Sequence, residues 1–305
     1  MPSRPPSFTV ATGALLALGV AAVSTSGPLM AAMVVPPLAI AFWRNAFATV
    51  ALLPSAATTR SAELSSLGRR RFALIAASGL ALAVHFGTWV TSLTLTSVAS
   101  ATALVCLQIG WVVAWQMLRG ERLTVGAATG LVVSFVGVLV VSGVDLTLSP
   151  EALLGDLLAL VGGIAAAAYI IVGSRARQSV STTTYTFVCY GTCAAILLVA
   201  CLVAGQPLWG YDARQWALLV AVTVTAQLMG HSVFNHLLAT TSPMVVSLAL
   251  LLEVPGAALL AAWFLGQYPP VAALAGLAVI LLGMTCVILN NRAEHREPVL
   301  QPPVD

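Results

Sequence analysis

The chain has 305 residues, of which 59% are hydrophobic and only 8% are charged, with a net charge of +3. Soluble domains carry roughly 25% charged residues, so this composition excludes a soluble globular protein and indicates an integral membrane protein. Every basic residue is an arginine and no basic cluster is interleaved with aromatic residues, so nucleic acid is not an expected partner. The five cysteines lie in apolar runs without a CxxC pair, which predicts small hydrophobic roles, no metal site and no cofactor.

Ten apolar segments are long enough, at ~20 residues each, to cross a bilayer as helices. At Ser149-Pro150-Glu151 a capping residue, a proline and an acid predict the start of the sixth helix. The short loops leave no room for a soluble domain. The expected fold class is all-α integral membrane, with ten transmembrane helices near residues 8–26, 37–55, 72–93, 97–118, 124–142, 153–173, 184–204, 215–238, 243–264 and 271–290.

The first segment also has an interpretation as a cleavable signal peptide, because Arg4 precedes an apolar run that contains small residues. However, the pattern Gly-x-Leu-Leu-Ala-Leu at residues 13–18 occurs again at residues 155–160, in the sixth segment. We therefore expect the first segment to be retained as a member of a repeated unit.

The stretch from His85 to Gly137 is repeated, without a gap, from His231 to Gly283. Four glycines and the histidine hold this register, which indicates an internal duplication. The pairs that carry it include Gly110 and Gly256, Gly120 and Gly266, Gly130 and Gly276, and Gly137 and Gly283. We expect the paired glycines in the fifth and tenth segments to let helix backbones approach closely.

Arginine placement predicts the orientation, because loops on the cytoplasmic side are rich in arginine. The loops after the second, fourth and sixth segments and both termini carry the arginines, except for Arg44 within a segment and Arg214 on the opposite side. Both termini are therefore expected to be cytoplasmic. Because each repeat holds five segments, the second copy must cross in the opposite sense, which makes an inverted repeat. We assign residues 8–142 to the first five-helix repeat, 150–290 to the second and 291–305 to a short cytoplasmic tail.

The chain resembles the drug/metabolite transporter superfamily, and within it the EamA-type transporters with two EamA domains. It departs from the family pattern at residues 266–269, where the glycine-glutamate-arginine turn is not repeated. The phrases that carry the resemblance are Phe42-Trp43-Arg44-Asn45, His85-Phe86 with Trp89, Gly120-Glu121-Arg122-Leu123-Thr124, Gly155-Asp156-Leu157-Leu158-Ala159-Leu160, Gly230-His231 with Asn235, and Glu253 with Pro255.

The resemblance implies a ten-helix carrier of the inner membrane that moves small metabolites, commonly amino acids and related compounds, mostly outward. Its expected partners are a small-molecule substrate and the lipid bilayer. Faces of small residues allow a homodimer without requiring one.

Ionisable side chains within the segments are candidates for substrate binding or coupling, because hydrocarbon disfavours them. Glu253 could exchange a proton during transport, or could support a kink at Pro255 by hydrogen bonding. His85 and His231 occupy equivalent positions and could act as a titrating switch, or could simply donate to neighbouring helices. Trp89 and Asn235 each lie one turn after a histidine and share its helix face.

Gln108, Trp111 and Trp115 recur at helical spacing in the fourth segment. Gln108 and Trp111 are candidates to hold an apolar or aromatic solute, whereas Trp115 is expected to anchor the helix at the membrane boundary. Arg44 could attract an anionic group; the alternatives are a structural ion pair or snorkelling to the interface.

The leading hypothesis from the sequence is a secondary transporter that exports a small amphipathic metabolite and is driven by protons or by another gradient. An uncoupled facilitated exchanger is the alternative within the same class. An intramembrane enzyme is not expected, because the chain lacks the HExxH and GxSxG motifs and a glycine-rich phosphate loop. A structural membrane protein is the remaining alternative, but it does not explain why ionisable groups lie at matching depths in the two repeats.

Overall fold

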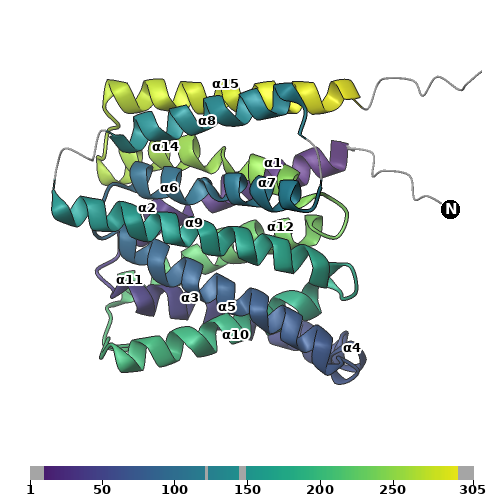
Figure 1. The fold of residues 1–305 in the computed structure, drawn as a ribbon. Helices are drawn as coiled ribbons and strands as arrows, with labels where there is room; N and C mark the ends of the chain where they lie inside the picture. Colours follow the sequence, from purple (N-terminus) through teal and green to yellow (C-terminus); the bar gives the residue numbers. More distant parts are fainter. Residues whose placement is uncertain (1–9, 121–122, 144–148, 295–305) are drawn as a thin grey trace, which may run out of the picture.

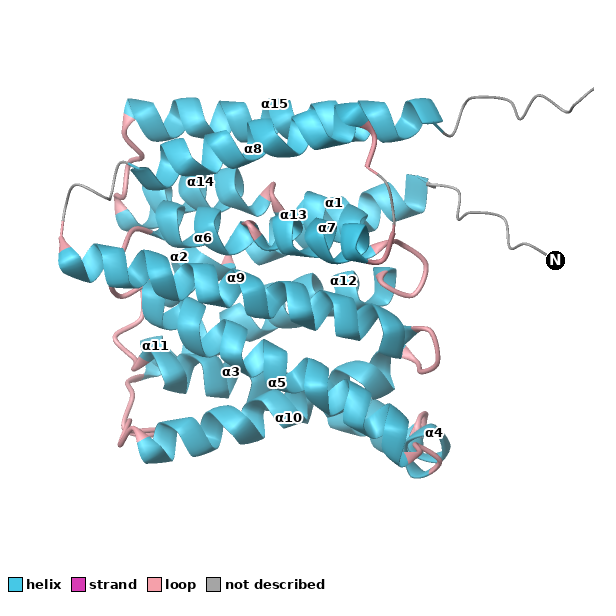
Figure 2. Cartoon of the chain, viewed as in Figure 1, coloured by secondary structure: helices cyan, strands magenta, loops and turns pink. Residues whose placement is uncertain are grey.

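The computed structural model describes residues 10–120, 123–143 and 149–294. This part of the chain is entirely helical and contains no strand, and loops are confined to the ends of the helices (Figure 2). The elements are α1 Val10–Ser24, α2 Ser26–Ala31, α3 Pro37–Thr58, α4 Ser61–Ser65, α5 Arg69–Ser92, α6 Val98–Cys106, α7 Gln108–Leu118, α8 Val125–Gly143, α9 Pro150–Arg177, α10 Thr182–Val203, α11 Ala213–Val222, the π-helix η1 Thr223–His231, α12 Ser232–Leu237, α13 Pro243–Leu250, α14 Glu253–Leu265 and α15 Val271–Glu294.

Within the described residues, eight helices or runs of joined helices are long and apolar enough to cross a membrane. The shorter apolar helices Val125–Val140 and Val271–Val287, within α8 and α15, complete the ten expected spans. We number the spans in chain order. Spans one, four, eight and nine are each built from more than one helix, namely α1–α2, α6–α7, α11–η1–α12 and α13–α14.

Side-chain caps begin several of the spans. The Ser149 hydroxyl accepts a hydrogen bond from the Ala152 amide at 3.1 Å, and Pro150 occupies the first position of α9, as the sequence predicts. Ser97, Ser181 and Ser242 cap α6, α10 and α13 in the same way. These caps satisfy amide groups that would otherwise be unpaired where each helix starts.

The helix contacts between the two repeats follow a pseudo-two-fold relation. The fifth and tenth spans, α8 and α15, lie side by side at one edge of the bundle, and the second and seventh spans, α3 and α10, lie together at the opposite edge (Figure 1). Likewise, α5 of the third span packs on α9 of the sixth, while η1 of the eighth span packs on α1 of the first. In these four contacts, exchanging the two repeats either leaves the pair of spans unchanged or turns one pair into the other, as a pseudo-two-fold relation requires.

Glycines make the contact between α8 and α15 possible. A Cβ atom at Gly130 would lie 2.6 Å from the carbonyl oxygen of Gly283, and one at Gly137 would lie 2.7 Å from that of Gly276. The backbones of the two helices therefore touch directly, as the sequence predicts for these glycines.

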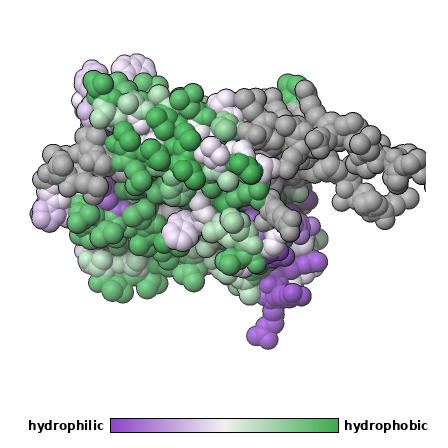
Figure 3. All heavy atoms as spheres, turned by 45° about the horizontal axis from the view of Figure 1, so that its top comes forward, coloured by the Kyte–Doolittle hydropathy of each residue, from purple (hydrophilic) through white to green (hydrophobic). Residues whose placement is uncertain are grey.

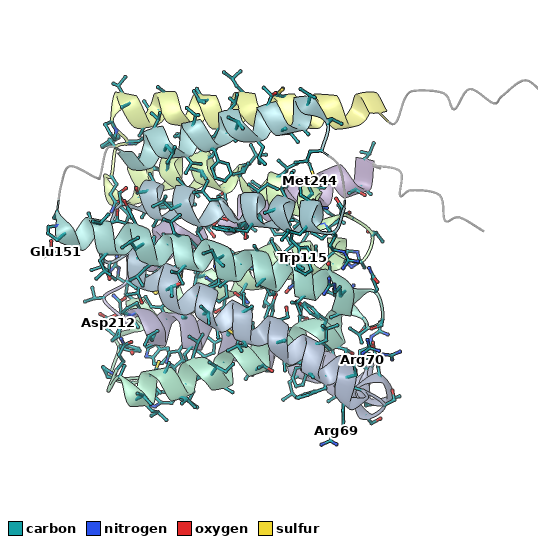
Figure 4. All side chains as sticks on the ribbon, in the orientation of Figure 1. Arg69, Arg70, Trp115, Glu151, Asp212 and Met244 are labelled. Atoms are coloured by element: carbon teal, nitrogen blue, oxygen red, sulfur yellow. The ribbon has the colours of Figure 1, made fainter. Side chains whose placement is uncertain are left out.

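Charge separates the two ends of the bundle. Arg69 and Arg70 lie at the end where the first helix begins, and Trp115 and Met244 lie toward it, whereas Glu151 and Asp212 lie at the other end (Figure 4). Between the ends the surface is largely hydrophobic over the face that carries α8 and α15 (Figure 3). Large apolar side chains are exposed on these two helices, including Val132 of α8 and Leu282 of α15. This belt is what a lipid-facing surface requires.

Prolines explain two of the four breaks in the spans. A proline cannot donate to the carbonyl four residues earlier and its ring crowds that group. Pro28 leaves the carbonyl of Ser24 without its helical donor, where α1 ends, and Pro255 does the same to the carbonyl of Leu251, where span nine breaks. The predicted kink at Pro255 is thus a full interruption between Leu250 and Glu253. The break at Leu107 and the π-helix in span eight have no proline, and the sequence patterns did not predict them.

Candidate functional site

A small central cavity of about 30 Å³ lies between the two repeats. Six of the eight side chains singled out in the sequence line it: His85, Trp89, Gln108, His231, Asn235 and Glu253. Three of them are placed there by interruptions in the helices. Gln108 is the first residue of α7, His231 the last of η1 and Glu253 the first of α14. Broken helices around a central site are a common feature of secondary transporters.

His85 is held by a hydrogen bond to a neighbouring helix. Its Nδ1 atom lies 3.0 Å from the carbonyl oxygen of Gly162. Because a carbonyl oxygen can only accept, Nδ1 is the donor and carries a proton. The ring also stacks on Trp89, with centroids 5.5 Å apart and planes inclined by 16°. This hydrogen bond to a neighbouring helix is the one expected if His85 has a structural role. It fixes the imidazole so that one face lies against the Trp89 indole.

His231 is surrounded by aromatic rings. Its centroid lies 5.3 Å from Phe86, 6.3 Å from Tyr169 and 6.5 Å from His85. Among the described residues its ring has no hydrogen-bond partner. The inverted repeat therefore brings its two equivalent histidines together at the cavity, one tied to α9 and the other free to meet a ligand.

Asn235 is the centre of a hydrogen-bonded chain next to the cavity. Its Oδ1 accepts from the Tyr169 hydroxyl at 2.7 Å, and its Nδ2 donates to the Tyr190 hydroxyl at 3.2 Å. Tyr190 in turn lies 3.2 Å from the Ser232 hydroxyl, which donates to the Gln227 carbonyl within η1. No pattern in the sequence indicates Tyr169 or Ser232, whereas Tyr190 can be found from the repeat, because it occupies the position of Arg44 in the second copy.

Glu253 lies in the wall of the cavity and is 7% exposed. Its carboxyl group has no hydrogen-bond partner within the described part of the chain. Beside it, the thiol of Cys106 donates to the Leu250 carbonyl at 3.3 Å, which satisfies an oxygen left over by the break in span nine. Glu253 is thus placed by the break but is not used to stabilise it, in contrast to the structural alternative expected from the sequence.

Arg44 does not reach the cavity. It is fully buried, and its guanidinium donates to Gln227 at 2.9 Å and to Ser26 at 3.1 Å. The same group covers the Phe86 ring at 4.0 Å. Both structural alternatives from the sequence are therefore wrong: in the described chain Arg44 has no ion-pair partner, and the first and eighth spans cover it so that it cannot snorkel. Its Nη2 atom has no hydrogen-bond partner there.

Trp111 also lies outside the cavity, with 48% of its surface exposed. The buried face of α7 consists of Gln108, Ile109, Val112 and Val113, and Trp111 projects from the opposite side of the helix. Trp115 is 38% exposed and packs at 5.3 Å on the guanidinium of Arg175. The structure thus places Trp111 apart from the cavity, because helical spacing does not identify the side of a helix that faces the protein.

Comparisons with known proteins agree with this architecture. A solved structure described as "Crystal structure of protein" is similar with a TM-score of 0.71, at 17% sequence identity, over 92% of this chain and 98% of that chain. At that identity the likeness shows the fold alone. No curated protein matches the sequence. A model of the EamA-like transporter family matches twice, over residues 11–143 and 153–289, and the chain belongs to this family of multi-pass membrane transporters within the drug/metabolite transporter superfamily.

Proposed function

We propose that this transporter exports small amphipathic or amino-acid-like metabolites across the inner membrane by alternating access, in exchange for protons, with Glu253 as the exchanging group. The observation that carries the proposal is the central cavity, whose wall contains a carboxyl group and two histidines. Glu253 and His231 lie at helix interruptions in the second repeat, and His85 lies on a helix of the first repeat. A carboxyl group without a hydrogen-bond partner at such a place can bind a proton or a substrate in turn.

The end of the bundle that carries Arg69 and Arg70 is closed by polar contacts. Glu63, in the short helix α4, accepts hydrogen bonds from the amide and hydroxyl of Ser181, both at 2.6 Å, and from Thr184 at 2.8 Å. Arg177 at the end of α9 donates to the carbonyl of Asn235 at 2.8 Å and to Thr182 at 2.7 Å. The Glu63 contacts join the two repeats at this end, whereas those of Arg177 hold elements of the second repeat together.

The opposite end is closed as well. Gln215 accepts from the Val34 amide at 3.0 Å, Gln206 accepts from the Leu38 amide at 3.2 Å, and the Trp43 indole donates to the Leu208 carbonyl at 2.9 Å. A cavity of about 30 Å³ holds little more than a water molecule, so the site must widen to admit a metabolite. Opening one set of contacts at a time would give alternating access.

The arginine-rich end is assigned to the cytoplasm, with both termini on that side, because positive loops are retained there during insertion. On this assignment Glu63 and Arg177 form the cytoplasmic closure, and Gln215 and Trp43 form the outer one. Export then requires the cytoplasmic closure to open first.

An uncoupled exchanger is the second candidate. The hydrogen bond from His85 to Gly162 favours it, because it gives one of the two histidines a structural role. In this case Glu253 shapes the cavity without exchanging a proton.

Counterflow in proteoliposomes decides between the two. Purified wild type, Glu253→Gln and the control Glu151→Gln, whose side chain is exposed at the end of the bundle, are compared with and without a pH gradient. Coupled export predicts that the gradient accelerates movement in wild type and in the control but not in Glu253→Gln. Movement that ignores the gradient in all three chains rejects coupling, and no movement of any solute rejects the transporter assignment for the solutes used.

A further inference from the structure

The wall of the cavity has an uneven distribution of charge. Among the described residues that line it, Glu253 is the acidic side chain and no arginine is present. The charge of Arg44 interacts with Glu253, His85 and His231, but Arg44 itself packs against the Phe86 ring and does not line the cavity. Because electrostatic energy falls with distance, a solute in the cavity meets the carboxyl group more closely than the guanidinium. The wall thus favours a cationic group over an anionic one.

Trp89 carries a second, independent sign of a ligand. It lines the cavity and is 2% exposed, yet its indole Nε1 has no hydrogen-bond partner in the described structure. Buried donors are nearly always satisfied, and each exception requires an explanation. An acceptor atom on a bound solute would provide the missing partner.

The remaining walls are suited to a flat ring. Trp89 and His85 form a stacked pair, and Tyr169 and Phe234 also line the cavity. Aromatic faces bind rings by stacking and attract cations through their negative faces. No other group in the described wall requires a second charge on the solute.

We propose that the substrates are small aromatic amines, with an ammonium group that meets Glu253 and an acceptor on the ring that meets Trp89 Nε1. This inference rests on the proposed transport function and narrows its substrate class. It separates aromatic amines from the corresponding amino acids, because the carboxylate of an amino acid would meet no cationic side chain in the wall other than the histidines.

The probes are four compounds built on a benzene ring that differ in the ring hydroxyl or in the charged end group: tyramine, phenethylamine, tyrosine and 4-hydroxyphenylacetate. Tyramine has both the ammonium group and the ring hydroxyl as an acceptor, and phenethylamine lacks the hydroxyl. Tyrosine adds a carboxylate to tyramine, and 4-hydroxyphenylacetate has a carboxylate in place of the aminomethyl group. Binding is measured as thermal stabilisation of the purified full chain, and transport as counterflow in proteoliposomes.

Wild type is expected to bind tyramine about 5- to 10-fold more tightly than phenethylamine, because only tyramine can accept the hydrogen bond from Trp89 Nε1. Trp89→Phe keeps the ring and should abolish this ratio, while Trp263→Phe, on an exposed side of α14, should retain it. Wild type should also prefer tyramine to 4-hydroxyphenylacetate by at least about tenfold, and Glu253→Gln should abolish this preference. Ratios within one variant do not depend on how much of it folds.

Several outcomes overturn the inference. Tyrosine or 4-hydroxyphenylacetate bound as tightly as tyramine, a ratio unchanged in Trp89→Phe, or no binding of any of the four would each reject it. The proposed function fails separately: tyramine that binds with the expected ratios but shows no counterflow would contradict transport, whereas counterflow of tyrosine without tyramine binding would contradict only the substrate class.

Discussion

The thiol of Cys106 donates to the carbonyl oxygen of Leu250 over 3.3 Å, and this hydrogen bond joins the break in span four to the break in span nine. The two breaks belong to different repeats. Because the cysteine also lines the cavity, the bond couples the geometry of both broken helices at the site itself.

Cys106→Ala should lower stability more than Cys193→Ala, which removes a buried thiol with no hydrogen-bond acceptor in the described chain. The difference should be about 1–2 kcal/mol, because the Leu250 carbonyl is left unsatisfied. Thermal unfolding of the purified variants measures it. Cys106→Ser, which keeps a donor, should recover part of the loss; equal melting temperatures for both alanine variants would show that the bond contributes nothing.

The Glu63 contact predicts a pH dependence. Burial acts to raise the pKa of this carboxyl, but hydrogen bonds from the side chain and backbone of Ser181 and from Thr184, with the charge of Arg60, hold it below the ordinary 4.5. The folded state therefore binds fewer protons than the unfolded state, so the stabilisation is complete above pH 4.5 and is lost as the pH falls through the folded-state pKa.

Glu63→Gln should accordingly melt roughly 2 °C below wild type at pH 7, and the two curves should converge as the pH falls below 4. Melting temperatures from pH 7 to pH 3 test this, with Glu151→Gln as the matched control at the other end of the bundle. A difference between wild type and Glu63→Gln that persists unchanged at the lowest pH would contradict an ionised Glu63.

Gly130→Ala should destabilise the contact between α8 and α15. The added Cβ would lie 2.6 Å from the Gly283 carbonyl oxygen, so the helices must separate, at a cost of roughly 1–3 kcal/mol. Gly68→Ala is the control, since a Cβ there meets nothing within 4 Å. Thermal unfolding compares the two, and similar melting temperatures would mean that the backbones of α8 and α15 are not in direct contact.

Gln108 and Trp111 provide a test of the site on one helix. Gln108→Leu removes an amide from the cavity wall and should reduce counterflow of a transported solute by about tenfold, the loss of one well-placed polar contact. Trp111→Leu changes a lipid-facing side chain and should leave counterflow within about twofold of wild type. The reverse order of effects would return Trp111 to the site and remove Gln108 from it.

The sequence predicted the spans and the pairing of the repeats because both depend on patterns that persist along the chain. Hydrophobic length identifies each helix, and the ungapped register from His85 to Gly137 identifies its counterpart. It also identified His85, His231 and Glu253 as site candidates, because a polar side chain in hydrocarbon must face the protein.

The positions of Arg44 and Trp111 could not be predicted in this way. Arg44 is buried in part by the eighth span, and its partner Gln227 there is 183 residues away in sequence, so it is not visible from local spacing. For Trp111 the spacing indicated a stripe but not its direction. The break at Leu107 has no proline from which it could be predicted. Gly163 of the neighbouring helix α9 packs closely beside it, since a Cβ there would lie 2.9 Å from the Val105 carbonyl oxygen.

The direct contact between α8 and α15 also sets an order of synthesis and assembly. Residues 144–270 separate the two helices, so α8 enters the membrane long before its partner exists. Until the last helix is inserted, the glycine face of α8 must remain against lipid or against provisional neighbours. The first repeat therefore cannot complete its packing until α15 has been inserted, and a truncated product that lacks α15 would leave that face without its partner.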